Sequence, residues 1–506
     1  MSRKPLTVVV LSALATFAVT LTGEYLRWDD RMHILFNPWL VNHALDLIWT
    51  KPYYNLFVPV TYTVWSGVYA LTDQAWAFHL LNIMLHALNS ALAYKICSRF
   101  ATSRPALFAA LIFAVHPLQV ETVAWISGGR DLLAATFTFS AMLAYLNRPR
   151  WLSVILFGLA LLSKPTVAPA PIAFALLIWW RDQKIPWALT AWAGLAVLAG
   201  YATQQIQLSD AQMLAPTTPL DRMLVAGDAL GFYLSKFLLP IGLTADYGRT
   251  PAVLLAHSLY RYTLPVLALV TALVVRGRAR VFVLWSLLLL APVLGLIPFQ
   301  AQNDSTVADR YMYLSMLGLA LFVAPRIAGL RIAPALIAGL AALSVVRAHA
   351  WTTNARFFND IHRKNPDSFM ANVSLGVENL LREDLGAAEH YLARARELRP
   401  MNAVTATNLG QVYWNQKRPD RILQELEPLL ASGEFLSRNK NETGGLSALH
   451  RVVARALWDT GKWDAANDHY CRFYKLDPEN KNGIEEIREF LKEKAKRGLP
   501  VDGCGG

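Results

Sequence analysis

The apolar run LTVVVLSALATFAVTL, Leu6–Leu21, decides the fold class, because runs of this kind recur along the chain as far as residue 347. Recurring apolar stretches of this length place the first two thirds of the chain in a lipid bilayer. From about residue 352 the sequence turns polar and charged, which indicates at least one further domain. We therefore predict an all-α protein: a polytopic bundle of membrane helices followed by a soluble helical domain.

The first run could also belong to a cleaved signal peptide, because Arg3 and Lys4 precede it. Its length fits either interpretation. Since many further apolar runs follow, we interpret Leu6–Leu21 as an uncleaved first span.

The composition fits a membrane domain and argues against two other classes. Hydrophobic residues make up 54% of the 506 residues and charged residues 17%, less charge than a soluble chain of this length normally carries. The net charge is +12, but the basic residues cluster between apolar runs, where they set membrane orientation, so we expect no nucleic-acid partner. Cys97, Cys471 and Cys504 are too few and too scattered for a disulfide framework or a zinc site.

The basic clusters predict the topology, because loops rich in Lys and Arg stay in the cytoplasm. The opposite loops should face the periplasm or an equivalent lumen, and they are residues 23–75, 116–131, the break at Lys164, 203–257 and 299–309. This alternation predicts about eleven spans in a membrane domain of residues 1–350. The last span would exit on the outer side, so residues 351–506 would lie there too.

Two stretches depart from this alternation. Residues 152–180 are too few for two full spans, so we predict a short broken pair with Ser163-Lys164-Pro165-Thr166 at its tip. Residues 220–240 would break the alternation if they crossed the membrane. We interpret them as a helix at the outer surface.

The polar C-terminal third contains a repeat. Leu375-Gly376 and Leu409-Gly410 lie 34 residues apart, and a third unit covers residues 454–478. This period and pattern are those of tetratricopeptide (TPR) units, helix pairs that bury their apolar faces by stacking on their neighbours. We therefore predict a C-terminal α-solenoid of TPR units, whose concave face would bind a peptide or a protein.

An acidic pair, Asp29-Asp30, follows the first span within Glu24–Arg31. One carboxylate could act as a general base that takes a proton from an acceptor hydroxyl, alone or beside a metal-binding neighbour. The alternative is a solvated loop end, where acidic residues outside a span usually lie. Trp28 and Asn37-Pro38-Trp39 suggest that this loop packs at the membrane interface, the depth that Trp favours.

Residues 116–131 interrupt an apolar stretch with polar and helix-breaking residues, among them Pro117 and Gly128-Gly129. Ionisable groups at membrane depth are costly and mark functional sites, and broken helix is tolerated where the backbone lines a cavity. His116 and Glu121 could orient an acceptor or assist a metal, although their spacing is not that of a zinc site. The alternative is a simple turn closed by an ion pair between Arg130 and Asp131.

Two later cations are candidates for a phosphate site. Lys164 lies between apolar runs and could neutralise a lipid phosphate or pyrophosphate, or else its ammonium could reach the membrane surface. Arg310, in Asp309–Leu314, has the planar fork that binds a phosphate through two parallel hydrogen bonds. Tyr311 and Tyr313 in the same motif could position a substrate or anchor the helix at the interface.

Together these motifs resemble one family, the TMTC-type (transmembrane and tetratricopeptide repeat) O-mannosyltransferases of the GT-C glycosyltransferase superfamily. The matching pieces are Trp28-Asp29-Asp30, Asn82-x-x-x-His86, His116-Pro117 with Glu121-Thr122-Val123-Ala124, Gly129-Arg130-Asp131-Leu132-Leu133 and Arg310-Tyr311-Met312-Tyr313-Leu314. The order of a membrane domain before repeats also matches. The chain departs from the family at Lys164-Pro165, where the family usually has Lys-Glu.

The resemblance implies a GT-C-like inverting glycosyltransferase that moves a sugar, expected to be mannose, from a polyprenyl-phosphate donor to a Ser/Thr hydroxyl of a protein acceptor. Asp29 or Asp30 would be the base. The donor phosphate would bind to Arg130, Lys164 and Arg310, and the acceptor would be positioned by His116, Glu121, Asp131, Tyr311 and Tyr313. No nucleotide cofactor is expected, and a divalent metal is compatible with the site but not required by any motif.

The short form has the look of a bacterial protein, which implies a multi-pass protein of the inner (cytoplasmic) membrane with its active site and TPR domain on the periplasmic side. Three other functions stay open. The same enzyme could modify an envelope lipid or polysaccharide, although the repeats favour a protein acceptor. A non-catalytic TPR scaffold would need one membrane anchor rather than about eleven spans, and a transporter would be expected to show an internal repeat within residues 1–350, which we do not find.

Overall fold

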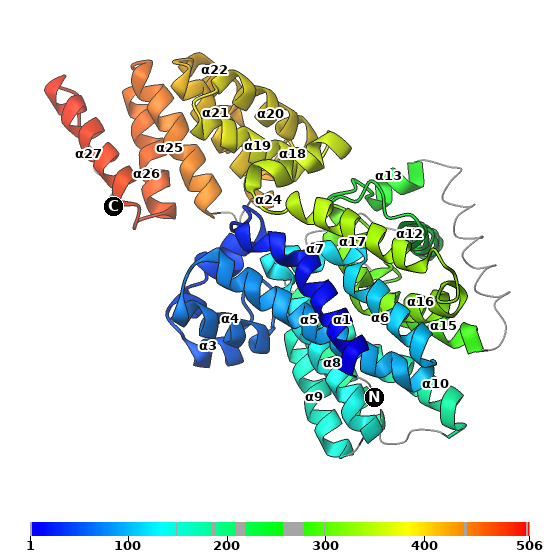
Figure 1. The fold of residues 1–506 in the computed structure, drawn as a ribbon. Helices are drawn as coiled ribbons and strands as arrows, with labels where there is room; N and C mark the ends of the chain where they lie inside the picture. The colour runs from blue at the N-terminus through cyan, green and yellow to red at the C-terminus, as the bar shows by residue number, and fades with distance from the viewer. Residues whose placement is uncertain are drawn as a thin grey trace. The chain divides into compact units, whose positions relative to one another are not determined.

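The structure is a computed structural model that describes residues 3–147, 149–184, 189–208, 218–256, 278–297, 299–439, 443–501 and 504. These residues are helical or lie in connecting segments and include no β-strand, which confirms the predicted all-α class (Figure 1). The chain divides into two compact units, residues 1–360 and 361–506, and the division falls inside α18.

The first unit is built from helices joined by turns, short 3-10 segments and one π-helical turn, Arg31–Leu35. Its α-helices within the described residues are α1 (Arg3–Phe17), α2 (Pro38–Val41), α3 (Leu45–Thr50), α4 (Pro59–Leu71), α5 (Ala75–Phe100), α6 (Ser103–Val115), α7 (Val120–Ala124), α8 (Gly129–Asn147), α9 (Arg150–Ser163), α10 (Ala170–Asp182), α11 (Thr190–Leu208), α12 (Pro219–Leu238), α13 (Pro251–Ala256), α15 (Arg278–Leu290), α16 (Met312–Ile327), α17 (Ala333–His349) and α18 (Asn354–Lys364).

Helix α5 lies at the centre of this bundle, where it packs against α1, α6 and α8 (Figure 1). One face of α5 is polar although it is fully buried, because Asn82, His86 and Asn89 follow the three- to four-residue spacing of a helix. Asn82 Nδ2 donates to the carbonyl of Trp125 at 2.8 Å, and Asn89 Nδ2 donates to that of Leu132 at 3.0 Å. His86 Nε2 bonds the carbonyl of Ala114 at 2.9 Å.

These contacts stabilise the broken segment between α6 and α8. The helix is interrupted there as predicted, by two 3-10 turns and the short α7. Breaking a helix in a low-dielectric environment leaves carbonyls without helical partners, and Asn82 supplies a donor to that of Trp125, while His86 and Asn89 bond carbonyls of the flanking helices. A Cβ on Gly128 would lie 2.2 Å from the Thr122 carbonyl oxygen, and one on Gly129 would lie 2.9 Å from Asn82 Oδ1, so both positions need glycine.

The second predicted break is also present. Helix α9 ends at Ser163 and α10 begins at Ala170, with a 3-10 turn over Pro165–Val167 between them. Pro165 and Pro169 account for the break, because proline cannot donate the helical hydrogen bond. Lys164 is thereby placed at the end of α9.

Among the described residues, two helical stretches are long and apolar enough to cross a bilayer unaided, Lys4–Thr22 and Ala75–Phe100. The first contains the apolar run Leu6–Leu21. Two bent pairs pass the same test together: Ser103–Val115 with Pro117–Ala124, bent by 48°, and Ala333–His349 with Asn354–Lys364, bent by 110°. The number of about eleven spans stays a prediction.

The second unit consists of short helices that pack in pairs around one core. They are α19 (Phe369–Leu381), α20 (Leu385–Leu398), α21 (Ala403–Asn415), α22 (Pro419–Glu425), α23 (Glu427–Ala431), α24 (Gly433–Arg438), α25 (Thr443–Asp459), α26 (Trp463–Leu476) and α27 (Lys481–Lys496). Helix α19 packs on α20, α21 on α25, and α25 on α26.

The repeated glycines of this unit mark close helix approaches. A Cβ on Gly376 would lie 2.5 Å from Leu392 Cγ, and one on Gly410 would lie 2.6 Å from Val452 Cγ1. The two glycines occupy the same place in their helices, α19 and α21, and each admits an apolar side chain from a packed helix. The 34-residue spacing of Leu-Gly pairs is therefore a packing requirement.

A disulfide joins Cys471 of α26 to Cys504, and Cys97 is buried and unpaired. The sequence spacing did not predict this single bridge, which is not a disulfide framework. The two Cα atoms are 4.9 Å apart although 33 residues separate the cysteines in sequence. The return of the chain after α27 brings them together, and sequence spacing does not reveal that return.

The disulfide should stabilise the second unit. Closing a loop of this length lowers the entropy of the unfolded chain, so reduction is expected to cost about 3 kcal/mol. We expect a reductant to lower the temperature of helix loss, followed by circular dichroism, in the wild type. A Cys471→Ser/Cys504→Ser variant should show the lower temperature with and without reductant, and an unchanged wild-type transition would contradict this account.

Candidate active site

Asp30 anchors the segment between α1 and α2 to the turn before α8. Its Oδ1 accepts hydrogen bonds from Ser127 N at 3.0 Å and Ser127 Oγ at 2.6 Å, and its Oδ2 accepts one from Leu26 N at 3.1 Å. The side chain is fully buried. Burial raises the pKa of this carboxyl to about 6, with a further contribution from the charge of Asp29, although its three hydrogen bonds favour the ionised form.

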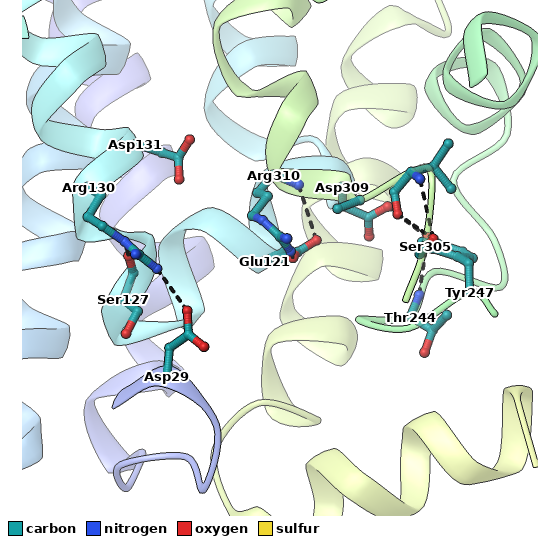
Figure 2. Close-up of polar contacts among 12 residues, drawn as sticks. Asp29, Glu121, Ser127, Arg130, Asp131, Thr244, Tyr247, Ser305, Asp309 and Arg310 are labelled. Atoms are coloured by element: carbon teal, nitrogen blue, oxygen red, sulfur yellow. Dashed lines mark hydrogen bonds and ion pairs between the residues drawn. The ribbon is translucent and has the colours of Figure 1, made fainter. Parts of the chain in front are cut away.

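Asp29 has a different environment, although it is the next residue along the chain. Its side chain is 33% exposed, and its Oδ2 accepts a hydrogen bond from Arg130 Nη2 at 3.0 Å (Figure 2). The Nε of Arg130 donates to the Ser127 carbonyl at 3.0 Å. The structure therefore gives the two aspartates different roles: Asp30 is sequestered and Asp29 is accessible.

Arg310 lies against the aromatic residues that neighbour Asp29. Trp28 and Trp125 are stacked with ring centroids 4.6 Å apart, and the Arg310 guanidinium lies 5.8 Å and 5.6 Å from their centroids. Arg310 also forms an ion pair with Glu121, and its backbone N donates to Glu121 Oε2 at 3.1 Å (Figure 2). The buried Glu121 thus fixes Arg310 through both its backbone and its side chain.

A pocket opens between the α8–α10 region and the start of α16. Lys164 Nζ contacts both oxygens of Asp131 there, each at 2.7 Å. The pocket is lined by Asp131, Lys164, Thr166, Arg310, Tyr311 and Tyr313, with Ala134, Val167, Leu289, Val293 and Leu314 as an apolar wall. The charges of Arg130 and Arg310 act on Lys164, so three cations share this region. Cations beside an apolar wall suit an amphipathic phosphate.

His116 lies in the scaffold of the site. Its Nδ1 accepts a hydrogen bond from Leu118 N at 3.2 Å, so its Nε2 carries the proton and donates to the Phe237 carbonyl at 3.0 Å. The ring stacks on Phe237. Both nitrogens are occupied by backbone groups, and His116 therefore holds the turn after α6 against α12.

Tyr311 and Tyr313 have different partners, although both belong to the motif that begins at Arg310. The Arg310 guanidinium lies over the Tyr311 ring, 4.9 Å from the centroid of that ring. The hydroxyl of Tyr313 lies 2.9 Å from His86 Nδ1 and accepts a hydrogen bond from Asn89 Nδ2 at 3.1 Å. Because Nε2 of His86 donates to a carbonyl, its Nδ1 accepts the Tyr313 proton. Tyr313 thus ties the pocket to the polar face of α5.

Three features of the site were not singled out from the sequence. Ser127 bridges Asp30 and Arg130, and Trp125 carries the stack on Trp28. Asp309 is buried and accepts a hydrogen bond from Tyr247 Oη at 2.7 Å (Figure 2). Burial and the nearby Glu121 raise the pKa of Asp309. The one indication in the sequence was that these residues lie within or beside the motifs described above. Serine and tryptophan do not by themselves indicate a catalytic role.

The described residues contain no cluster of three or more His, Cys, Asp and Glu side chains that could hold a metal ion.

One family model and several known proteins are similar to parts of this chain. The family model described as dolichyl-phosphate-mannose-protein mannosyltransferase matches residues 57–203, less than a third of the chain. Protein O-mannosyl-transferase TMTC3 of Mus musculus is 36% identical over 88 residues, 17% of this chain and 10% of that protein. Protein O-mannosyl-transferase Tmtc2 of Drosophila melanogaster is 30% identical over 148 residues, 26% of this chain and 15% of that protein.

These matches confirm the resemblance to TMTC-type protein O-mannosyltransferases that the motifs predict. With the apolar helices, they indicate a membrane protein. The matched segments span about a tenth to a seventh of the length of these relatives. Glu121, Arg130, Asp131 and Lys164 lie inside the matched family region, whereas Asp29 and Arg310 lie outside it.

Removing the charge of Glu121 should destabilise the first unit. Glu121→Gln leaves the largely buried Arg310 without its counter-ion. We expect this to lower the free energy of unfolding by about 3 kcal/mol, measured by thermal unfolding in detergent. The double variant Glu121→Gln/Arg310→Met should recover most of that loss, because no unpaired charge is then buried. Equal stability of Glu121→Gln and the wild type would contradict the importance of the pair.

The raised pKa of Asp30 predicts a pH-dependent stability. The folded state holds the Asp30 proton more tightly than the unfolded chain does. The free energy of unfolding therefore falls as pH rises from about 4 through about 6, where the carboxyl ionises in the unfolded chain before it does in the folded state. Asp30→Asn cannot ionise. Between pH 4.5 and 7.5 the wild type should therefore lose stability relative to Asp30→Asn, by about 2 kcal/mol. A constant difference across this range would show that Asp30 is not perturbed.

Proposed function

We propose that this chain is an inverting glycosyltransferase of the membrane that moves mannose from a polyprenyl-phosphate donor to a Ser/Thr hydroxyl of a protein acceptor. The observation that carries this proposal is a part-exposed carboxylate, Asp29, held by Arg130, whose neighbour Asp131 lines a pocket together with Lys164 and Arg310. The match to a mannosyltransferase family supports the sugar, and the names of the similar proteins support a protein acceptor.

Asp29 is the proposed general base. It is accessible, whereas every contact of Asp30 is internal and its oxygens accept three hydrogen bonds. A base must reach the hydroxyl proton within hydrogen-bond distance, which a buried and fully engaged carboxylate does not do. Arg130 holds Asp29 in one orientation through Nη2.

Lys164 and Arg310 are the proposed ligands of the donor phosphate, with Arg130 contributing positive charge. Lys164 and Arg310 line the pocket with Tyr311, and each is held by an acidic partner, Asp131 or Glu121. Such pairs keep the cations in place before the donor arrives, so little reorganisation is needed. The apolar wall, including Leu289 and Val293, would face the first part of the lipid chain.

The transfer is a single nucleophilic displacement at the anomeric carbon of the sugar. The acceptor hydroxyl gives its proton to the Asp29 carboxylate while its oxygen bonds to the anomeric carbon of the sugar. The bond from that carbon to the phosphate oxygen breaks, and its electron pair stays on the phosphate, where the cations stabilise the charge. Attack opposite to the leaving phosphate inverts the configuration. The products are the glycosylated acceptor and polyprenyl phosphate, and Asp29 releases its proton to water.

The second unit would receive the acceptor protein. Its helix pairs and 34-residue glycine spacing support a TPR solenoid, a fold that binds peptides along a concave face. The Cys471–Cys504 disulfide supports an oxidising compartment such as the periplasm, because such bonds are rare where thiols are kept reduced. With the charge pattern of the loops, it favours an active site on the outer side of a bacterial inner membrane.

Asp29→Asn should strongly lower transfer, and because it also removes the counter-ion of Arg130, its unfolding temperature is measured beside that of the wild type. Purified protein would receive radiolabelled polyprenyl-phosphate mannose and envelope proteins, and the loss of a general base should lower the rate roughly 10²- to 10⁴-fold. Asp46→Asn is the matched control, because Asp46 is an exposed acid of the same outer segment. It should transfer at the wild-type rate.

The distribution of the label decides between acceptors. Label on protein supports the proposal, and label on lipid or polysaccharide would replace the acceptor but keep the enzyme. Wild-type activity in Asp29→Asn would remove Asp29 as the base. If the wild type transfers neither mannose nor any other sugar from a panel of lipid-linked donors, the non-catalytic TPR scaffold would be the remaining function.

A further inference from the structure

Ser127 is part of a closed ring of hydrogen bonds that joins both aspartates to Arg130. Its N and Oγ donate to Asp30 Oδ1 at 3.0 Å and 2.6 Å, and its carbonyl accepts from Arg130 Nε at 3.0 Å. Arg130 Nη2 then donates to Asp29 Oδ2 at 3.0 Å. Since Asp29 and Asp30 are consecutive residues, the ring closes through the backbone.

This ring determines the plane of the Arg130 guanidinium. Two of its nitrogens, Nε and Nη2, are engaged on separate acceptors, and the group lies 5.6 Å from the centroid of the Trp125 ring. A guanidinium held at Nε and at one Nη cannot rotate about its long axis without losing a bond. Nη1 has no protein partner within the described part of the chain, which leaves it for a ligand.

The turn that carries Ser127 is itself confined. The Gly128 Cα lies so close to the Thr122 carbonyl that a Cβ would approach it to 2.2 Å, and Gly129 packs against Asn82 and Trp65. Such close packing leaves the Ser127 carbonyl little freedom to move. On the other side of the ring, Asp30 Oδ2 accepts from Leu26 N, so Asp30 links the segment between α1 and α2 to this confined turn.

We propose that Ser127 and Asp30 are a positioning pair that orients Arg130 and, through Arg130, the Asp29 carboxylate. The inference rests on the proposed function, in which Asp29 is the base. Neither Ser127 nor Asp30 touches the reacting atoms, because Asp30 is fully buried and Ser127 is buried beneath it. The conservative change that isolates this role is Ser127→Ala, which removes one of the two donors to Asp30 Oδ1 and keeps the other.

A positioning role predicts a particular kinetic pattern. Ser127→Ala should lower kcat roughly 10- to 100-fold, because small displacements of a reacting group are costly, and should change KM for the lipid donor less than twofold. Ser127→Thr restores a hydroxyl at the same place and should restore kcat. Ser153→Ala is the matched control: Ser153 is buried in α9, and its Oγ donates to the Arg150 carbonyl at 2.6 Å and accepts from Trp192 at 3.3 Å.

The outcomes separate this inference from the proposed function. If the wild type is active and Asp29→Asn inactive, full activity of Ser127→Ala, or no rescue by Ser127→Thr, would overturn the positioning pair. If the wild type transfers no sugar at all, the proposed function fails. The hydrogen-bond ring is then tested by measuring unfolding temperatures. Ser127→Ala and Arg130→Met should then shift the temperature non-additively, because they act in one network, and additive shifts would overturn the ring.

Discussion

Backbone groups in the interior of a membrane domain must be satisfied by protein, and this constraint organises the first unit. The segment from His116 to Gly128 departs from regular helix and leaves carbonyls that water does not reach. Asn82 of α5 donates to the Trp125 carbonyl of that segment, His86 and Asn89 bond carbonyls of the flanking helices α6 and α8, and glycines let the segment approach α5 closely. The irregular backbone that presents Ser127 and Arg130 therefore exists because α5 is polar along one face.

The charges of the site follow from the same constraint. Within the described residues, Arg130 pairs with Asp29, Lys164 with Asp131 and Arg310 with Glu121. Each cation would be costly in an apolar surrounding without its acid. Two of these pairs hold Lys164 and Arg310 in the lining of one pocket, so the electrostatic environment for the proposed anionic lipid would be built before the lipid binds.

The sequence predicted the helical class, the two helix breaks and the three ion-paired cations of the candidate site, because each has a local cause. Proline and glycine interrupt helices wherever they stand, and ionisable residues in apolar stretches are conspicuous. His116 shows the limit of this reasoning. It was a candidate for orienting an acceptor, but its two nitrogens bond backbone groups, one of them 121 residues away.

What the sequence determined by itself was the membrane-type composition, the periodicity of the C-terminal helices and the set of residues able to do chemistry. What only the tertiary structure decided was their environment. Asp29 and Asp30 have the same chemistry and adjacent positions, yet one is accessible and the other is buried against Ser127, 97 residues along the chain. Cys471 and Cys504 are likewise joined only by the return of the chain after α27. Burial and pairing depend on which distant segments meet, and that is a property of packing rather than of local sequence.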